Sequence, residues 1–224
     1  MLLRGGCEIK KTTMSKIYIK VCGNAQEENI LAVKDINPDL MGFIFYKDSP
    51  RHAMLRELRD TVHEIPEQTR KVGVFVNEPI LNLKKLVILC DMHLVQLHGG
   101  EDLEYCKELT QKSDFGVIKV FNVDDDFDFS VTKEFEQVAH FFLFDTKSNK
   151  PGGSVKKFNW DKLKEYNGEL SFFLAGGIGP DDAEEIKSLK HDKLIGIDVN
   201  AAFETEPGVK NVEKLDAFIK ELRQ

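Results

Sequence analysis

Cysteine is scarce in this chain of 224 residues, and it has no long apolar run. Four cysteines are too few for a disulfide framework at this length, so a reducing compartment, the cytoplasm, is expected. No apolar stretch approaches the roughly 18 residues of a membrane span, and the N-terminus lacks the apolar core of a signal peptide. The sequence therefore predicts no membrane partner.

Positive charge is not in excess, because 31 Lys and Arg stand against 38 Asp and Glu, for a formal net charge of -7. A nucleic-acid backbone needs a basic binding surface, so no nucleic-acid partner is expected. The six histidines are scattered, with no pair at i, i+4 and no Cys-x-x-Cys, which excludes the common metal-site patterns. The sequence also has no Walker A loop and no Gly-x-Ser-x-Gly motif.

Eight apolar runs recur along the chain at intervals of roughly 20 to 30 residues. They cover residues 17–22, 40–45, 71–76, 94–97, 116–121, 141–145, 172–175 and 194–199. Most are near-continuous, as is typical of strands buried on both faces. Charged stretches with helical spacing lie between them, at 25–35 after Asn24 as an expected N-cap, and at 78–90, 101–111, 181–190 and 212–223.

This alternation predicts an α/β fold, a single (β/α)8 TIM barrel. A doubly wound open sheet is the rival, but it usually carries a glycine-rich phosphate turn after its first strand, whereas Gly176 and Gly177 follow the seventh run. No Pro-, Gly- or Ser-rich linker divides the chain. We assign residues 1–15 to a short N-terminal extension, expected to be mobile, and 16–224 to the barrel. The acidic run at 124–128 is expected to be a solvated loop.

Residues able to move a proton or bind an anion stand where the predicted strands end. Cys22 and Asp145 end the first and sixth runs. Barrel active sites lie at the carboxyl ends of the strands, so this thiol and carboxyl are expected to face each other across one mouth. Taken singly, a cysteine here is more often a core residue and an aspartate more often a turn residue.

A phosphate site is expected after strands seven and eight, where barrels commonly bind phosphate through backbone amides. Gly176 and Gly177 allow close backbone approach, and Asn200 and Ala201 open the loop after strand eight. Alternatively, Gly176 and Gly177 only form a tight turn between a strand and a helix.

The ordered strand ends resemble those of the phosphoribosylanthranilate isomerase family. The matching segments are Lys-Val-Cys-Gly (20–23), Gly-Phe-Ile-Phe-Tyr…Ser-Pro-Arg (42–51), Val-Gly-Val-Phe-Val-Asn (72–77), Val-Gln-Leu-His-Gly (95–99), Phe-Asp-Thr…Gly-Gly-Ser (144–154), Phe-Asn-Trp (158–160), Leu-Ala-Gly-Gly-Ile (174–178) and Gly-Ile-Asp-Val (196–199). No single segment is decisive, but together they cover nearly all of residues 17–223.

The resemblance implies an Amadori rearrangement of a phosphorylated aminoribose in tryptophan biosynthesis, with no metal and no cofactor. It implies Asp145 as general acid and Cys22 as general base. It also implies that Arg51 pairs with the substrate carboxylate and that His98 lines the substrate site. Gly153, Ser154, Gly176, Gly177, Asn200 and Ala201 complete the expected substrate-binding set. The partner is thus a phosphorylated small molecule, and the protein is expected to be a monomer or a homodimer.

Acid and base chemistry in one site requires the pKa of the carboxyl to rise and that of the thiol to fall. Lys20 and Lys119 are candidates for favouring a thiolate, and strand alternation decides which of them reaches the mouth.

The sequence departs from the family pattern in two loops. Val155 replaces the last glycine of the loop after strand six, and Asn200, Ala201 and Ala202 replace a stretch that often carries two serines. Main-chain phosphate binding is therefore expected, since the hydroxyl groups are absent. Indole-glycerol-phosphate synthase, metal-dependent sugar-phosphate epimerases and a non-catalytic phosphosugar-binding barrel are the alternatives. The first lacks its Lys-rich Ser-Pro-Ser signature here, and the second its metal ligands.

Overall fold

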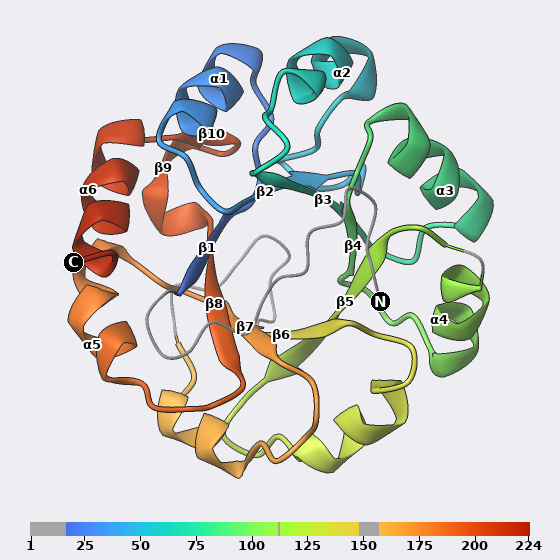
Figure 1. The fold of residues 1–224 in the computed structure, drawn as a ribbon, viewed down its shortest axis with the longest axis vertical. Coiled ribbons are helices and arrows are strands. Elements are labelled where there is room, and N and C mark those ends of the chain that lie inside the picture. Colours follow the sequence, from blue (N-terminus) through green and yellow to red (C-terminus); the bar gives the residue numbers. More distant parts are fainter. Residues whose placement is uncertain (1–16, 112, 148–156) are drawn as a thin grey trace.

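The strands form one closed parallel barrel in sequence order (Figure 1). The computed structural model describes residues 17–111, 113–147 and 157–224. The strands are β1 Tyr18–Val21, β2 Leu40–Ile44, β3 Arg70–Phe75, β4 Leu94–Leu97, β5 Gly116–Val123, β6 Phe141–Thr146, β7 Phe172–Leu174 and β8 Leu194–Val199. Because β8 pairs with β1, the predicted barrel is confirmed and the open sheet is wrong. The expected extension at 1–15 lies outside the described residues.

Helices and short 3-10 segments surround the barrel (Figure 1). The described elements are α1 Glu27–Asp35, α2 Leu55–His63, α3 Ile80–Leu89, α4 Leu103–Thr110, η1 Phe129–Phe135, η2 Trp160–Glu165, η3 Pro180–Asp182, α5 Ala183–Ser188, η4 Ala201–Phe203 and α6 Val212–Leu222. A small hairpin, β9 Glu204–Glu206 and β10 Val209–Lys210, lies between α6 and α1. Helix α2 was not predicted from the sequence. No helix in the described part of the chain is both long enough and apolar enough to cross a membrane.

Asn24 does not cap the first helix, contrary to the sequence prediction. Helix α1 begins two residues later than expected, after Gln26. Asn24 is instead fully buried, and its Nδ2 donates to the carbonyl oxygens of Val21 and Gly42 at 2.8 and 3.0 Å. The amide therefore joins the end of β1 to the middle of β2, where it fixes the chain directly after Cys22.

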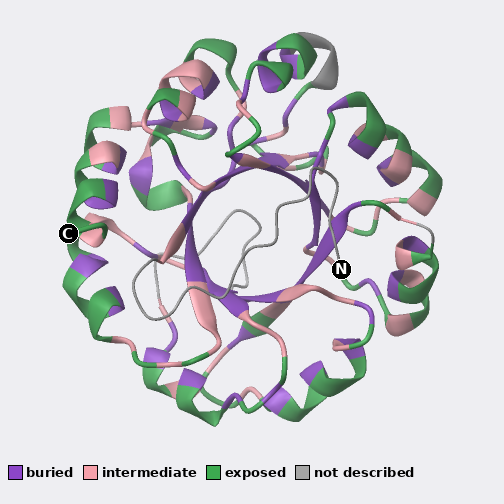
Figure 2. Ribbon diagram, viewed as in Figure 1, coloured by how far each residue is buried: buried purple, intermediate pink, exposed green. Residues whose placement is uncertain are grey.

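Two apolar cores lie on the two faces of the barrel wall. The inner core fills the barrel and consists of Leu40, Val72, Leu94, Ile118, Val120, Leu143, Phe173 and Ala175. The outer core lies between the strands and the helices. In Figure 2 the strands form a largely buried ring, while the outward sides of the helices are exposed. Burial on both faces explains why most of the strand sequences are continuously apolar.

The amino end of the barrel repeats one hydrogen-bond arrangement at three strand pairs. The residue just before β2, β4 or β6 accepts, through its side chain, a backbone N–H from the preceding strand. The bonds are Ile19 N to Asp39 Oδ2, Lys71 N to His93 Nδ1, and Val117 N to His140 Nδ1, each 3.0 Å long. These bonds satisfy backbone groups at the end opposite the mouth.

Candidate active site

Cys22 and Asp145 belong to one mouth, at the carboxyl ends of β1 and β6. Asp145 shares its face of β6 with Leu143, which packs inside the barrel. The Asp198 carboxylate on β8 links the two groups. Burial is the largest cause of the raised pKa of Cys22 and of Asp198, the charge of Asp198 adds to the first rise, and that of Asp145 adds to the second. The geometry predicted from the strand ends thus brings thiol and carboxyl into one electrostatic environment.

Lys20 and Asp198 form an ion pair inside the barrel, directly below Cys22. Their Nζ and Oδ2 atoms are 2.7 Å apart, and the Lys20 side chain is fully buried. Burial alone would lower the pKa of Lys20, but the Asp198 carboxylate and Cys22 together raise it above its ordinary value. For Asp198, burial raises the pKa and Lys20 opposes the rise. The second oxygen of Asp198, Oδ1, is buried and has no hydrogen-bond partner among the described residues.

The sulfur of Cys22 lies beside the Lys20 ammonium, in space left by Gly42. A Cβ atom on Gly42 would stand 2.8 Å from Cys22 Sγ and 3.1 Å from Lys20 Nζ. Burial raises the pKa of the Cys22 thiol, and Lys20 opposes this through its charge and a hydrogen bond. The chemistry expected from the sequence calls for a lowered thiol pKa. Here the effect of burial outweighs that of the Lys20 charge, so the pKa of Cys22 is raised.

Lys119, the other cation suggested by the sequence, does not reach the thiol. Its Nζ lies 3.1 Å from Glu101 Oε2 and donates to the Gly99 carbonyl oxygen at 3.2 Å. Adjacent residues on a strand point to opposite faces, so Lys119 lies outside the barrel wall lined by Ile118 and Val120. Lys20 is therefore the cation that faces the sulfur.

His98 lies against the carboxyl group of Asp145. Its Nε2 is 3.2 Å from Asp145 Oδ2, and its Nδ1 is 3.2 Å from the amide Nε2 of Gln96. Gln96 is 1% exposed and lies two residues earlier on β4, so both side chains point into the barrel. The sequence prediction gave His98 a substrate contact, and the structure places one edge of its ring against the candidate acid.

Arg51 is held by Glu204 of the β9–β10 hairpin. Its Nε is 2.9 Å from both carboxylate oxygens, and its Nη2 is 2.6 Å from Oε2. Lys210 also contacts this carboxylate at 2.7 Å and donates to Asn200 Oδ1 at 2.6 Å. Burial alone would raise the pKa of Glu204, but Arg51 and Lys210 lower it. The guanidinium is thus fixed at the edge of the mouth by a buried, shared carboxylate.

The diglycine after β7 adopts backbone angles that favour glycine, with φ of 90° at Gly176 and 71° at Gly177. A Cβ atom on Gly176 would lie only 2.2 Å from Oγ1 of Thr146, which donates to the Gly176 carbonyl oxygen at 3.2 Å. The loop therefore packs tightly on the end of β6. Ala201 opens η4 after β8 and is exposed. Gly153 and Ser154 of the sequence prediction lie outside the described residues.

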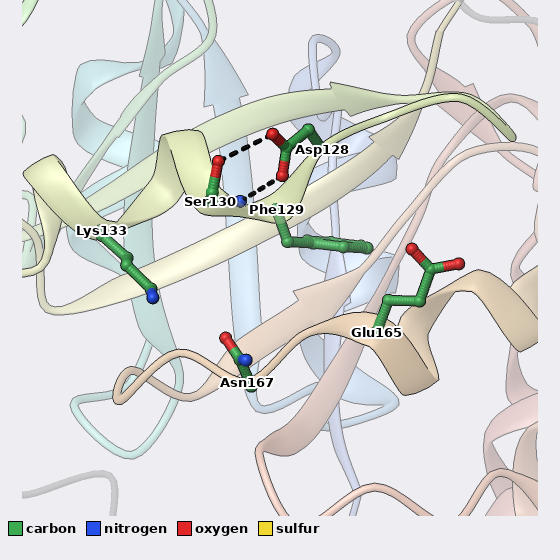
Figure 3. A pocket seen from close by; sticks show the side chains of 6 residues that line it. All are labelled: Asp128, Phe129, Ser130, Lys133, Glu165 and Asn167. Carbon is green, nitrogen blue, oxygen red and sulfur yellow. Dashed lines mark hydrogen bonds between the residues drawn. The ribbon is translucent and has the colours of Figure 1, made fainter.

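A separate surface hollow lies between η1 and η2, and none of the predicted site residues that the structure describes lines it (Figure 3). Its lining residues are Asp128, Phe129, Ser130, Lys133, Glu165 and Asn167. The Asp128 carboxylate there accepts bonds from the Ser130 amide and hydroxyl, each 2.8 Å long. These contacts cap η1 and assemble no catalytic pair. Within the described residues, no three His, Cys, Asp or Glu side chains gather to hold a metal ion.

Comparison with known proteins agrees with this arrangement of strand ends. The family model described as "PRAI: N-(5'phosphoribosyl)anthranilate (PRA) isomerase" matches residues 19–221. The chain belongs to this family. The N-(5'-phosphoribosyl)anthranilate isomerase of Phocaeicola vulgatus is 39% identical over 208 residues, which are 93% of this chain and 98% of the relative. That of Parabacteroides distasonis is 39% identical over 207 residues, 92% of this chain and 93% of the relative.

Solved structures of the isomerase family share the fold. Phosphoribosyl anthranilate isomerase from Thermotoga maritima has a TM-score of 0.81 at 27% identity, covering 92% of this chain and 98% of that one. A second structure, of the family enzyme in complex with reduced 1-(o-carboxyphenylamino)-1-deoxyribulose 5-phosphate, has a TM-score of 0.77 at 25% identity. It covers 92% of this chain and 98% of that one.

Several polar residues of this isomerase-family mouth were missing from the predicted site. They are Gln96, Asp198, Glu204 and Lys210, whereas Lys20 was suggested as a cation near the thiol. Lys20, Gln96 and Asp198 each stand two residues before a predicted site residue, and so on the same face of their strand. A polar side chain inside an otherwise apolar strand is a usable signal for such residues. Glu204 and Lys210 lie in the hairpin after η4, where no strand pattern indicates their direction.

Proposed function

We propose that this chain catalyses the isomerisation of N-(5'-phosphoribosyl)anthranilate to 1-(2-carboxyphenylamino)-1-deoxyribulose 5-phosphate, a step of tryptophan biosynthesis. The observation that carries the proposal is one barrel mouth in which Cys22 stands beside the Lys20–Asp198 pair and Asp145 beside His98, in a chain of this family. The reaction needs one proton donor and one proton acceptor, and these side chains are of the right chemical types.

Asp145 is the proposed general acid. It gives a proton to the ring oxygen of the phosphoribosyl group while the bond between that oxygen and the anomeric carbon breaks. The amine nitrogen supplies its electron pair to that carbon, so an open-chain iminium ion forms and Asp145 is left as a carboxylate. The neighbouring His98, 3.2 Å away, is placed to stabilise that carboxylate.

Cys22 is the proposed general base, acting as its thiolate. It removes the proton from the carbon next to the iminium, the electrons of that bond form a carbon–carbon double bond, and nitrogen regains its pair. The resulting enol becomes the ketone product by proton transfer from its hydroxyl to carbon. The raised pKa of Cys22 reduces the thiolate fraction but makes each thiolate a stronger base. The adjacent Lys20 ammonium stabilises the negative sulfur.

The remaining predicted residues are proposed to hold the substrate. Arg51 is proposed to meet the anthranilate carboxylate with its guanidinium charge, while Glu204 holds the Nε and Nη2 atoms of that group in place. The backbone at Gly176, Gly177, Asn200 and Ala201 is proposed to bind the phosphate. The orphaned Asp198 Oδ1 can accept a bond from a sugar hydroxyl group. For Gly153 and Ser154, a substrate contact rests on the sequence alone.

We further propose that the catalytic unit is a single chain in the cytoplasm, with residues 16–224 as its domain. All the described residues of the proposed site come from one barrel. Cys22, Cys90 and Cys106 are free thiols, which agrees with a reducing compartment. A dimeric relative is known from Thermotoga maritima.

The activity is tested by generating the labile substrate in the assay from anthranilate and phosphoribosyl pyrophosphate and following the loss of its fluorescence. We expect turnover by the purified chain. A well-folded protein that binds the phosphorylated substrate without converting it would instead be a non-catalytic phosphosugar-binding barrel.

The acid and base assignments predict that Cys22→Ala and Asp145→Asn each lower kcat/KM at least about a hundredfold, the usual contribution of such a group. Asp145→Asn is nearly isosteric and Cys22→Ala removes a single heavy atom, so circular dichroism and thermal unfolding should show an intact fold. Cys106→Ala is the matched control, because that thiol lies in the outer core. Near-normal turnover in either site variant would refute the corresponding role.

A further inference from the structure

Three side chains form a line from the wall of the barrel to the proposed acid. The Gln96 amide nitrogen is 3.2 Å from His98 Nδ1, and His98 Nε2 is 3.2 Å from Asp145 Oδ2. Gln96 is 1% exposed, and its Oε1 has no hydrogen-bond partner among the described residues. Gln96 does not touch the carboxyl group itself, so any effect on the acid passes through His98.

The direction of the hydrogen bond at Nδ1 determines where the imidazole carries its proton. An amide nitrogen donates and cannot accept. With that nitrogen facing it, Nδ1 of His98 is the acceptor, and a ring that carries one proton then holds it on Nε2. Nε2 lies 3.2 Å from Asp145 Oδ2, so a proton held on this nitrogen is next to the carboxyl group.

A carboxyl group with an N–H next to its Oδ2 keeps its own proton on the other oxygen. We propose that Gln96 is a positioning residue for the acid: it fixes the His98 proton on Nε2, so that Asp145 carries its transferable proton on Oδ1. Without this constraint the ring could place its proton on Nδ1. Nε2 would then accept the acid proton from Asp145, and that proton would be directed at His98 rather than at the substrate.

The burial of Gln96 supports this role. Neighbouring inward positions at the same level of the barrel are filled by apolar residues such as Ile118 on β5. An apolar side chain at position 96 would avoid the cost of a buried carbonyl oxygen without a partner. The amide makes one bond that such a side chain cannot make, and that bond is to His98.

The first test reads the tautomer directly by nitrogen NMR of protein labelled with 15N-histidine. His93 and His140 provide internal references, because their Nδ1 atoms accept backbone N–H groups of Lys71 and Val117. We expect His98 to show the same pattern, with a protonated Nε2 and a bare Nδ1. A proton on Nδ1 of His98 in the wild-type chain would overturn the proposal.

The second test uses Gln96→Leu, with Gln96→Met as a second variant if the first does not fold. Each should spread the His98 signals over both tautomers while those of His93 and His140 stay unchanged. Each should also lower kcat roughly tenfold with little change in KM, because the acid is misdirected while substrate binding remains. Unchanged kcat in a folded variant whose His98 tautomer is disturbed would refute the role.

This inference rests on the proposed isomerase activity, and the two can fail separately. If the wild-type chain has no turnover, the proposed function fails while the tautomer measurement still stands. If the wild type is active and the Gln96 variants are equally active, the positioning role alone fails.

Discussion

The ammonium of Lys20 lies between a carboxylate and a thiol in the interior of the barrel. A buried ion pair gains little over apolar packing, but removing one partner leaves an uncompensated charge and is strongly destabilising. The Lys20–Asp198 pair therefore adds little net stability. It does require both charges to be kept together, because losing either one leaves the other buried without a partner. It also keeps a cation next to the sulfur of Cys22.

Lys20→Met should lower the free energy of unfolding by about 3–5 kcal/mol, since Asp198 then remains buried without its partner. The double variant Lys20→Met/Asp198→Asn should lose less than the sum of the two single variants. Urea unfolding of the wild type, Lys20→Met, Asp198→Asn and the double variant measures this coupling.

Lys107→Met is the matched control for Lys20→Met. Lys107 pairs with Glu104 at 2.6 Å on the exposed face of α4, and its removal should change stability by less than about 1 kcal/mol. A Lys20→Met loss no larger than that of the control would contradict the buried-charge argument.

At the scale of the elements, the strand pairs at the amino end of the barrel depend on neutral histidines. Burial, followed by the charges of Lys71 and Arg70, lowers the pKa of His93 to about 4. Burial also lowers the pKa of His140. A neutral ring is required because Nδ1 accepts a backbone N–H, and a protonated ring would present a donor there.

The lowered pKa of His93 makes the stability of the barrel sensitive to acid. Between the unfolded value of about 6.5 and the folded value of about 4, the unfolded chain binds more protons than the native one. Stability contributed by this group is therefore complete above pH 6.5 and is lost as pH falls through this window. His93→Asn keeps an acceptor for Lys71 N but cannot titrate, so its unfolding free energy should fall less steeply than that of the wild type.

Urea unfolding at a series of pH values from neutral down to about 4 measures this slope. His63→Asn, at an exposed position, should keep the wild-type slope. An equal slope in wild type and His93→Asn would show that this histidine does not control the acid sensitivity.

The loop after β7 illustrates how backbone geometry and packing combine in one element. Gly176→Ala would place a methyl group 2.2 Å from Thr146 Oγ1, in a backbone conformation with φ of 90°. We expect a loss of about 2–4 kcal/mol in stability, from overpacking and strain together. KM should rise about tenfold, because the proposed phosphate-binding backbone is displaced.

Gly179→Ala is the control for Gly176→Ala in the same loop. Its new Cβ would be 3.7 Å from Asp182 Oδ2, an ordinary contact, and its φ of -121° suits any residue. Its thermal unfolding temperature should stay close to that of the wild type. If both variants lose stability equally, the clash at Gly176 is not the cause.

At the scale of the whole molecule, the barrel closes where β8 pairs with β1, beginning with Tyr18 opposite Gly196. The family match begins at residue 19. A chain that starts at Met14 should therefore fold and retain kcat/KM within about twofold of the full chain, since chain ends commonly tolerate such changes. The fluorescence assay and thermal unfolding check this. A folded but inactive shortened chain would show that residues 1–13 act in the reaction.

Much of the strand order could be predicted because burial on both faces is a local property of the sequence. The bounds of β4 and β8 agree with the predicted runs at 94–97 and 194–199. The errors occur where a polar residue has two uses. Asn24 is a residue type that commonly caps helices, but its amide donates to backbone carbonyls of two strands. Only the packed barrel brings Gly42 within reach of that amide.

The sequence alone could place the proposed site residues at strand ends, but it could not predict their partners. Cys22 and Asp145 could be assigned to strand ends because each directly ends an apolar run. The pairing of Arg51 with Glu204, 153 residues away, follows from the hairpin after η4 and not from any local pattern. The choice between Lys20 and Lys119 depended on strand alternation in the folded barrel.

The sequence by itself determined the eight strands, their order and the residues at their ends, because hydrophobic periodicity and turn chemistry act over a few neighbouring residues. Only the tertiary structure decided which charges meet. Lys20 and Asp198 are 178 residues apart in sequence, yet they stand opposite each other in the register that closes the barrel. Closure forces both inward-facing side chains into one buried space, where each neutralises the other beneath Cys22.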